Sequence, residues 1–422
     1  MNEFLAMLPE VFLALTLMAV IVGEITYHGE RLRLIVPIAL LGLAVTLAQT
    51  VLAFQNPAAQ VLSRSIAIDG ISLFFKLLFI VLAILSIIGS THTKEIPEGK
   101  RAEFVALVVA STLAMGLVAA AADLMLAFLA LQFMNLIAYF LAGYSKRSML
   151  STEAAVKYMA FCAVSGALFV YGLAILFAHS HSLNMYEIHR ALSDSPLPHG
   201  KTLVIFGLIF ISFTFQMAAF PMYLWTPDVL EGSPTPVSSF ISIGTRAAGF
   251  ALALRFLIIV FAKATGEAGR WEVLGPLEWT RIVAWVSGLS MAIGGLLAYR
   301  QVAAKRMVGY LIVASSGFML LGILVLDEIG VGALLYNLVI ELFALIGIFY
   351  VLSFYHDELG SDRLTDLRGM LRRSALESVF LVIFLLCLVG LPPTPGFIGK
   401  FALVGVAVRH QWPILAAVAI GS

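Results

Sequence analysis

Ionisable side chains stand inside long apolar stretches of this sequence. Lys157 follows Glu153 by four residues in EAAVKYMAF, Glu341 lies in the middle of LLYNLVIELFALIGIFY, and Lys400 follows a proline-rich turn in PPTPGFIGKF. Charged groups in apolar surroundings are costly, so they are found where they pair with one another or move protons. We therefore consider Lys157, Glu341 and Lys400 as candidate proton-relay residues.

The residues around Lys157 and Lys400 indicate where the two lysine side chains lie. The spacing of four residues places Glu153 and Lys157 on one helical face, which suits a relay lysine and equally a lysine that extends its ammonium to the cytoplasmic surface. Lys400 has apolar residues on both sides. We expect it to face a cavity opened by the proline-rich turn.

Arg246 is the other deep charge, ten residues into an expected span. A guanidinium does not deprotonate in proteins, so a buried Arg246 requires an acidic partner. Three placements of Glu341 follow: a structural ion pair with Arg246, a proton-carrying site, or a position in solvent or at the lipid edge.

Other polar residues in apolar runs have simpler interpretations. Glu10 is expected at a helix start or interface, and Asp69 and Asp123 are expected to cap helix N-termini, which favour negative charge. Cys162 and Cys387 lie far apart and predict buried free thiols. The histidines have no metal-ligand spacing, and we find no phosphate-binding loop, CxxC motif or catalytic triad.

The composition places these residues in a membrane. Of 422 residues 61% are hydrophobic and 12% charged, whereas about a quarter of the residues in soluble domains are charged. The net charge of +1 and the lack of a long basic run argue against nucleic acid as a partner.

Crossing the bilayer core takes roughly 20 apolar residues in a helix. This length predicts spans near 5–23, 33–54, 70–91, 102–120, 122–143, 154–178, 202–220, 237–262, 281–298, 307–325, 331–353 and 377–390, with a shorter segment at 396–408. The first is a retained span, because it lacks the basic region and cleavage site of a signal peptide. Residues 413–422 are apolar but too short to cross, so we expect the chain to stop within a further span. A two-to-one excess of Lys and Arg in alternate loops predicts a periplasmic N-terminus.

Two apolar segments are interrupted by prolines, in FPMYLWTPDVLEGSPTPVSSF and in GLPPTPGFIGKF. Proline removes a backbone donor, and in lipid such a break survives only inside protein or beside a wet cavity. Paired broken helices are typical of inverted-repeat transporters, whose ion path lies at the breaks; the alternative is two plain loops. The residues expected to form the breaks are Pro221, Pro227, Pro392, Pro393, Pro395 and Gly396.

Several blocks occur in the order known from one family: LPEVFLAL, DGISLFF, EAAVKYM, PMYLWTPDVLEGSPTPVSSF, AKRMVGY and GLPPTPGFIGKF. In these the chain resembles subunit N of bacterial proton-pumping NADH-quinone oxidoreductase (respiratory complex I), one of the antiporter-like, Mrp-related membrane subunits. The WTPDV–GSPTPV block is the most specific, because related antiporter and hydrogenase subunits tend to carry an LPDAH-type version. The resemblance covers nearly the whole chain, although the family usually has about one and a half further spans.

The resemblance implies an all-α polytopic membrane protein of about 13 transmembrane helices in two inverted five-helix repeats, with two broken helices. A single antiporter-like membrane domain would fill residues 1–422, with N-terminal helices in 1–100, a first repeat in 101–262 and an incomplete second repeat in 280–422.

The resemblance also implies a non-redox subunit of a multi-subunit enzyme in the bacterial inner (plasma) membrane. Its role would be proton translocation coupled to quinone reduction, beside other membrane-arm subunits and the lipid bilayer. NAD, FMN, iron–sulfur clusters and quinone are expected on partner subunits, and no cofactor is expected in this chain.

The proton path implied by the family is altered here. Lys157 and Lys400 match two of its lysines, but Gln132 stands where the family has a glutamate, and Gln216 and Arg246 stand where it has lysines. Glutamine does not titrate, and arginine does not release its proton. We therefore predict that the N-terminal half-channel does not pump by the family's route, while the C-terminal half contributes through Lys400.

Two other functions remain open from the sequence. One is an Mrp-like cation/proton antiporter or a hydrogenase membrane subunit, against which Gln132 and Gln216 count. The other is a non-pumping scaffold, which the loss of titratable pairs would suit.

Overall fold

The computed structural model describes residues 7–26, 34–55, 59–61, 64–266 and 269–421. Within these residues, eleven helices are long and apolar enough to cross a membrane: α2 (Leu8–Thr26), α3 (Ile35–Ala53), α4 (Gly70–Ser90), α5 (Arg101–Ala120), α6 (Leu124–Ala142), α7 (Met149–Ser180), α9 (His199–Gln216), α11 (Thr235–Phe261), α12 (Trp279–Tyr299), α13 (Ala304–Leu324) and α14 (Glu328–Leu359). Each helix corresponds to one of the first eleven expected spans. Residues 5, 6 and 33 of those expected spans lie outside the described residues.

The shorter elements lie between and after these spans. They are the α-helices α8 (Met185–Asp194), α10 (Trp225–Gly232), α15 (Met370–Arg373), α16 (Ala375–Val389), α17 (Pro395–Arg409) and α18 (Pro413–Gly421), the 3₁₀ turns η2 (Glu98–Lys100) and η3 (Met222–Leu224), and the strands β1 (Ala59–Val61), β2 (Ile66–Ile68), β3 (Ala262–Ala264) and β4 (Trp271–Val273). The strands form two antiparallel ribbons, β1–β2 and β3–β4, which sequence reasoning did not anticipate.

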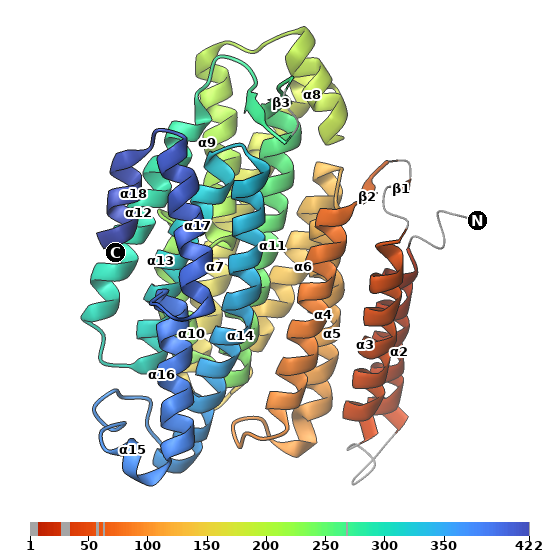
Figure 1. Cartoon of the computed structure of the whole chain (residues 1–422). Helices are drawn as coiled ribbons and strands as arrows, with labels where there is room; N and C mark the ends of the chain where they lie inside the picture. Colours follow the sequence, from red (N-terminus) through yellow and green to blue (C-terminus); the bar gives the residue numbers. More distant parts are fainter. Residues whose placement is uncertain (1–6, 27–33, 56–58, 62–63, 267–268, 422) are drawn as a thin grey trace.

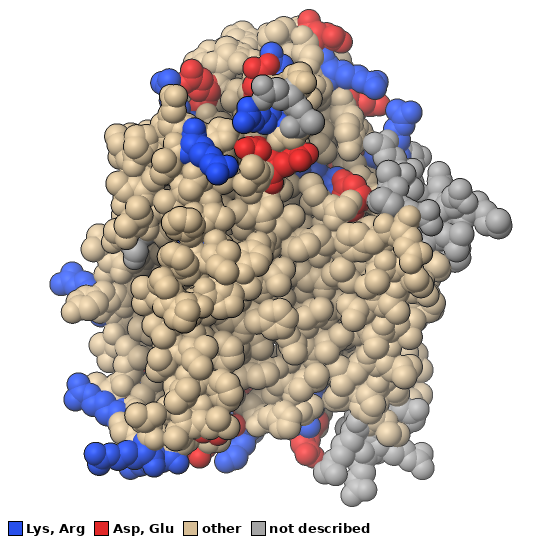
Figure 2. Space-filling view, viewed as in Figure 1, with Lys and Arg blue, Asp and Glu red and all other residues tan. Residues whose placement is uncertain are grey.

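The helices run side by side in one bundle, with α2 and α3 at one edge and the C-terminal helices α16 to α18 at the opposite edge (Figure 1). Charged side chains gather at the two ends of the bundle, and a broad belt between them is almost free of charge on the face shown in Figure 2. This distribution suits a protein whose middle lies in lipid. The chain is thus a helical polytopic membrane protein.

The first break separates α9 from α10. The backbone N–H of Phe220 donates to Ser290 Oγ on α12 at 2.9 Å, and the indole N–H of Trp225 donates to the Phe215 carbonyl at 3.1 Å. The rings of Phe215 and Trp225 also pack together, with centroids 5.4 Å apart. Because lipid offers no hydrogen-bond partners, these contacts allow a break at membrane depth.

Only some prolines of this region interrupt a helix. Pro221 lies in the break, and Pro227 lies in the first turn of α10, where its missing N–H costs little. Pro234 instead precedes α11, and Pro236 lies in the first turn of α11. Pro234 and Pro236, which lie in the same proline-rich stretch of the sequence, therefore start the next span and do not form the break.

The second break joins α16 to α17. Gly390 ends α16 with φ 84°, a conformation that side chains disfavour, and Pro392 and Pro393 follow before α17 begins. Gly396 then packs against the backbone of α16: a Cβ on Gly396 would overlap the carbonyl oxygen of Cys387. The close approach of the two half-helices therefore requires glycine.

Replacing Gly396 by alanine tests this requirement. We expect Gly396→Ala to destabilise the protein by about 1–3 kcal/mol, because the added methyl group forces α16 and α17 apart. Thermal unfolding of the purified protein measures the loss. Gly405 on α17 is the matched control, since no atom lies within 4 Å of a Cβ built there. Equal melting temperatures for the two variants would contradict the packing role of Gly396.

Candidate functional site

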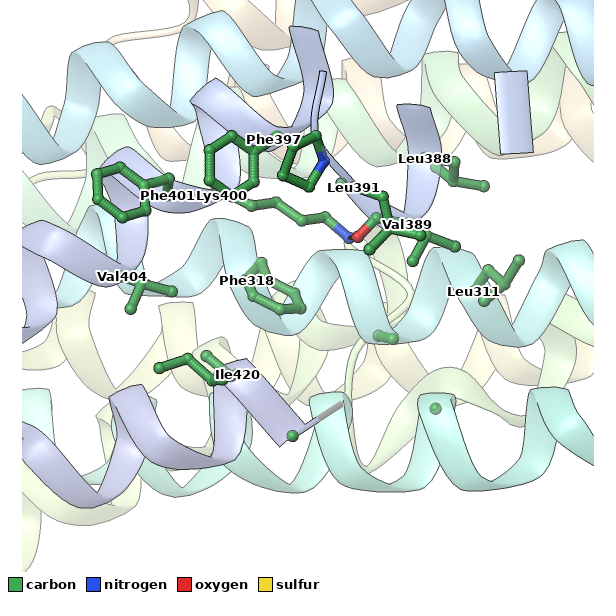
Figure 3. Close-up of a pocket in the computed structure, with 16 residues that line it drawn as sticks. Leu311, Phe318, Leu388, Val389, Leu391, Phe397, Lys400, Phe401, Val404 and Ile420 are labelled. Carbon is green, nitrogen blue, oxygen red and sulfur yellow. Dashed lines mark hydrogen bonds between the residues drawn. The ribbon is translucent and has the colours of Figure 1, made fainter. Parts of the chain in front are cut away.

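Lys400 lies on α17, just after the second break. Its ammonium donates to the carbonyl of Val389 at 3.1 Å and lies 4.5 Å from the centroid of the Phe318 ring on α13. A cavity of 540 Å³ opens beside it, lined mainly by apolar side chains that include Leu311 and Phe397 (Figure 3). Lys400 therefore has the expected position at the break, and its part in proton movement stays a prediction.

Glu341 and Arg246 form an ion pair in the interior, between α14 and α11. Their side chains are 3% and 1% exposed. The second carboxylate oxygen of Glu341 accepts hydrogen bonds from Ser315 Oγ on α13 and from Asn337 Nδ2, the latter at 2.9 Å. The expectation of a structural ion pair is confirmed, and a position of Glu341 in solvent or at the lipid edge is wrong.

This closed arrangement keeps two opposite charges in place. Both oxygens of Glu341 are occupied, and Arg246 directs a second nitrogen to the Ile312 carbonyl at 3.5 Å. Removing one partner of a buried pair leaves the other charge without compensation, which costs more than removing both. Whether Glu341 carries protons stays a prediction.

The pair is tested by comparing single and double neutralisation. Glu341→Gln leaves the Arg246 guanidinium unpaired and should destabilise the protein by about 3–5 kcal/mol, whereas Glu341→Gln with Arg246→Gln should recover much of that loss. Thermal unfolding provides the measurement. As a control, Glu272→Gln breaks an exposed pair with Lys263 (side chains 55% and 51% exposed) and should cost less than about 1 kcal/mol. A double variant less stable than Glu341→Gln would be inconsistent with mutual compensation.

Lys157 lies on α7 with its side chain 38% exposed, between two carboxylates. Its ammonium is 2.7 Å from Glu153 Oε1 and 2.5 Å from Asp228 Oδ2 on α10. The expected pairing with Glu153 is confirmed. Asp228 was not expected, because nothing in the sequence relates two residues 71 positions apart. Whether Lys157 acts as a proton relay stays a prediction.

The same carboxylate reaches the second half of the chain. Asp228 Oδ1 lies 2.8 Å from Arg306 at the start of α13, and Arg306 also lies 3.0 Å from Glu231 on α10. Five charged side chains thus form one cluster across α7, α10 and α13.

The two glutamines lie on helices that flank α7. Gln132 on α6 accepts a hydrogen bond from Cys162 Sγ at 3.5 Å. Gln216 is buried at the end of α9, packed against Gly249 of α11. Both positions hold a neutral amide. Cys162 is buried as expected, whereas Cys387 is only partly buried; both are free thiols.

Two further ion pairs, of which one is buried on both sides, join the N-terminal helices to the bundle. Glu10 on α2 pairs with Lys76 on α4, and both side chains are less than 10% exposed. The expected helix-start position of Glu10 is confirmed, because it lies in the first turn of α2, but an interface position is wrong, because its carboxylate points inward to this lysine.

Asp69 and Asp123 cap helices as expected, and Asp69 does more. Asp69 caps α4 by accepting from the Ser72 N–H at 2.8 Å, and Asp123 accepts from the first backbone N–H groups of α6. Asp69 also accepts two hydrogen bonds, at 2.8 and 2.9 Å, from the buried Arg255 of α11. Burial opposes ionisation, but Arg255 holds the pKa of Asp69 below its ordinary value.

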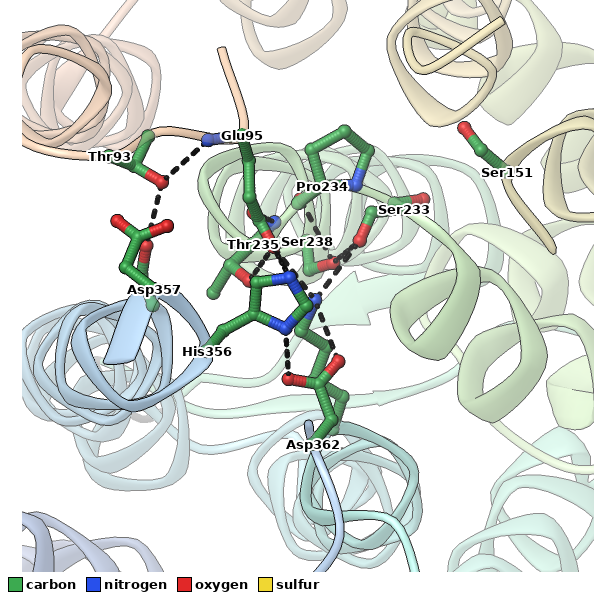
Figure 4. A network of polar contacts seen from close by, with 12 residues as sticks. Thr93, Glu95, Ser151, Ser233, Pro234, Thr235, Ser238, His356, Asp357 and Asp362 are labelled. Carbon is green, nitrogen blue, oxygen red and sulfur yellow. Dashed lines mark hydrogen bonds and ion pairs between the residues drawn. The ribbon is translucent and has the colours of Figure 1, made fainter. Parts of the chain in front are cut away.

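A second polar network lies where α13 begins and α14 ends (Figure 4). Glu95, in the loop after α4, accepts from the hydroxyl of Thr235 at 3.0 Å, and Lys305 lies 3.7 Å from Glu95 and 3.4 Å from Asp362. Asp362 is also 2.8 Å from His356. Burial opposes ionisation, yet His356 and Lys305 hold the pKa of Asp362 below its ordinary value. The stabilisation from ionised Asp362 is therefore present at neutral pH and is lost as the pH falls through that lowered pKa.

The fold and the site define a class of protein: a polytopic helical membrane protein with two interrupted helices and several buried charges. A family model described as NADH:quinone oxidoreductase/Mrp antiporter, transmembrane, matches residues 121–422. NADH-quinone oxidoreductase subunit N 2 of Chloroherpeton thalassium is 32% identical over 419 residues, which are 98% of this chain and 81% of that protein. NAD(P)H-quinone oxidoreductase subunit 2 of Thermosynechococcus vestitus is 33% identical over 94% of this chain and 74% of that protein. The chain belongs to the NADH:quinone oxidoreductase/Mrp antiporter family.

Solved structures share the architecture. A chain of respiratory complex I from Thermus thermophilus matches with a TM-score of 0.78 at 29% identity, covering 98% of this chain and 85% of that one. The Mrp complex from Dietzia sp. matches with a TM-score of 0.82 over 99% of this chain and 77% of that one. At 20% identity the second likeness concerns the fold alone.

Proposed function

We propose that this chain is a membrane-arm subunit of a complex I-like NADH-quinone oxidoreductase and takes part in proton translocation coupled to quinone reduction. The names of its relatives and the likeness to a complex I chain support this assignment. The nicotinamide, flavin, iron–sulfur and quinone chemistry belongs to partner subunits, and this chain contributes no redox step. Its place is the bacterial inner membrane, among other membrane-arm subunits, with a periplasmic N-terminus.

The proposed arrangement has two inverted repeats, in residues 101–262 and 280–422, within about 13 transmembrane helices. Each repeat contains one broken helix, α9–α10 in the first and α16–α17 in the second. Breaks in corresponding positions favour this arrangement, because such pairs are typical of inverted-repeat transporters.

The first half does not carry protons by the family's route. The observation that carries this proposal is the buried Arg246–Glu341 pair, closed by Ser315 and Asn337. Arg246 stays protonated at any working pH, and its charge is held by a partner at the centre of the bundle. Gln132 and Gln216 add hydrogen-bonding groups that do not titrate.

The second half retains a lysine that is able to exchange its proton. Lys400 contacts one carbonyl and one aromatic ring, and its side chain borders a cavity large enough for several water molecules. Among the residues that the structure describes, no carboxylate forms an ion pair with Lys400, in contrast to Arg246. Proton transfer through Lys400 is therefore the step that we assign to this chain.

The proposal is tested by the number of protons moved per quinone reduced, measured with the intact complex in membrane vesicles. We expect Lys400→Ala to lower this ratio by about the number of protons that one channel moves. We expect Lys157→Ala to leave the ratio nearly unchanged. Lys400→Arg separates charge from proton exchange, because arginine keeps the charge without releasing a proton; it should behave like Lys400→Ala.

If Lys157→Ala lowered the ratio by the number of protons that one full channel moves, the proposal that the first half is altered would be refuted. An unchanged ratio in both Lys400 variants would instead favour a scaffold that spaces other subunits. Blue-native electrophoresis of each variant establishes that the complex is assembled.

A further inference from the structure

Asp228 is shared by two cations that belong to different halves of the chain. One carboxylate oxygen lies 2.5 Å from the Lys157 ammonium of α7, and the other lies 2.8 Å from the Arg306 guanidinium of α13. Asp228 itself is only 21% exposed, so this pairing is partly shielded from water. Lys157 and Arg306 therefore act on each other through one carboxylate.

The helix that carries Asp228 is held tightly on both sides. A Cβ on Gly232, at the end of α10, would overlap the Leu150 carbonyl oxygen of α7, and a Cβ on Gly309 of α13 would lie 2.8 Å from the Cα of Pro227. Backbones in such close contact transmit small displacements, because packed interiors have little free space. A shift of Asp228 toward one cation would thus move α10 against both neighbours.

The charges in the cluster are not balanced. Three carboxylates, of Glu153, Asp228 and Glu231, face two cations, Lys157 and Arg306. The Tyr310 phenol is a further titratable group near Arg306. If Lys157 becomes neutral or turns away, Asp228 keeps Arg306 as its cationic partner within the cluster. The ion pairing of Asp228 therefore depends on Lys157. The ion pairing of Arg306 depends in turn on Asp228.

We propose that Asp228 is a positioning residue that couples the state of Lys157 in the first half to Arg306 in the second half. This inference rests on the proposed function, and it supplies a connection that needs no proton to pass Gln132, Gln216 or Arg246. The coupling sets how fast the complex turns over, whereas Lys400 determines how many protons move.

A mutant cycle in the assembled complex tests the proposal, with quinone-reductase turnover in membrane vesicles as the measurement. Lys157→Gln and Arg306→Gln should each lower turnover, by about threefold, and the double variant should lower it by about the same factor, because both remove one connection. In an Asp228→Asn background, that connection is already absent. The further loss from either substitution should then be small.

Two more variants separate positioning from general stability. Asp228→Glu keeps the carboxylate and should restore most of the turnover lost in Asp228→Asn. Glu231→Gln is the matched control: it removes the other partner of Arg306 and keeps Asp228, so the Lys157–Arg306 coupling should persist. If Asp228→Asn prevents assembly, the Lys157/Arg306 mutant cycle is measured in the native and the Glu231→Gln backgrounds. Coupling in both backgrounds supports the proposal, and turnover losses that multiply in either background contradict it.

The proposal would be overturned if the turnover losses of Lys157→Gln and Arg306→Gln multiplied in the double variant. It would also be overturned if the coupling between Lys157 and Arg306 were equal in the native and the Asp228→Asn backgrounds. Failure of the proposed function would show differently, as an unchanged proton ratio in the Lys400 variants. Turnover and ratio are measured in the same vesicles, so the two outcomes are distinguishable.

Discussion

A charge removed from water needs an opposite charge or hydrogen-bonding partners, and this requirement ties the bundle together. Arg246 and Arg255 both lie on α11, the helix at the centre of the fold, and each is almost fully buried. Their partners come from elsewhere in the chain, Glu341 from α14 and Asp69 from the start of α4. Each pair fixes how two distant segments meet, because a shift of either helix would leave a charge unpaired in a medium of low dielectric constant.

The two helix breaks satisfy a related requirement of the backbone. At the first break, the Trp225 indole and Ser290 supply the missing hydrogen bonds, and neither side chain titrates at neutral pH. At the second, the ammonium of Lys400 bonds the freed Val389 carbonyl. One titratable group therefore serves both the structure of the break and the proposed proton step. These two partners of the first break are structural, which agrees with the neutral Gln216 at the end of α9.

The distribution of charge separates two kinds of electrostatic contact. The Arg246–Glu341 pair is enclosed, and both carboxylate oxygens of Glu341 accept hydrogen bonds, so it holds its geometry. The cluster around Asp228 is partly exposed and has one carboxylate shared by two cations, so its pairings are able to exchange. Enclosed pairs maintain an architecture, while shared and partly hydrated ones respond to changes in charge. The chain has both kinds of contact between its two halves, and they differ in burial.

The sequence by itself determined the membrane class, the eleven long helices and both breaks, because span length, composition and proline chemistry are local properties. It also required a partner for Arg246, since guanidinium stays charged. Tertiary structure alone decided that Asp228 meets both Lys157 and Arg306, and that Glu10 turns inward to Lys76. Such contacts join residues far apart in the chain, and no local pattern encodes which helices become neighbours. Only the packed bundle brings those charges within reach of one another.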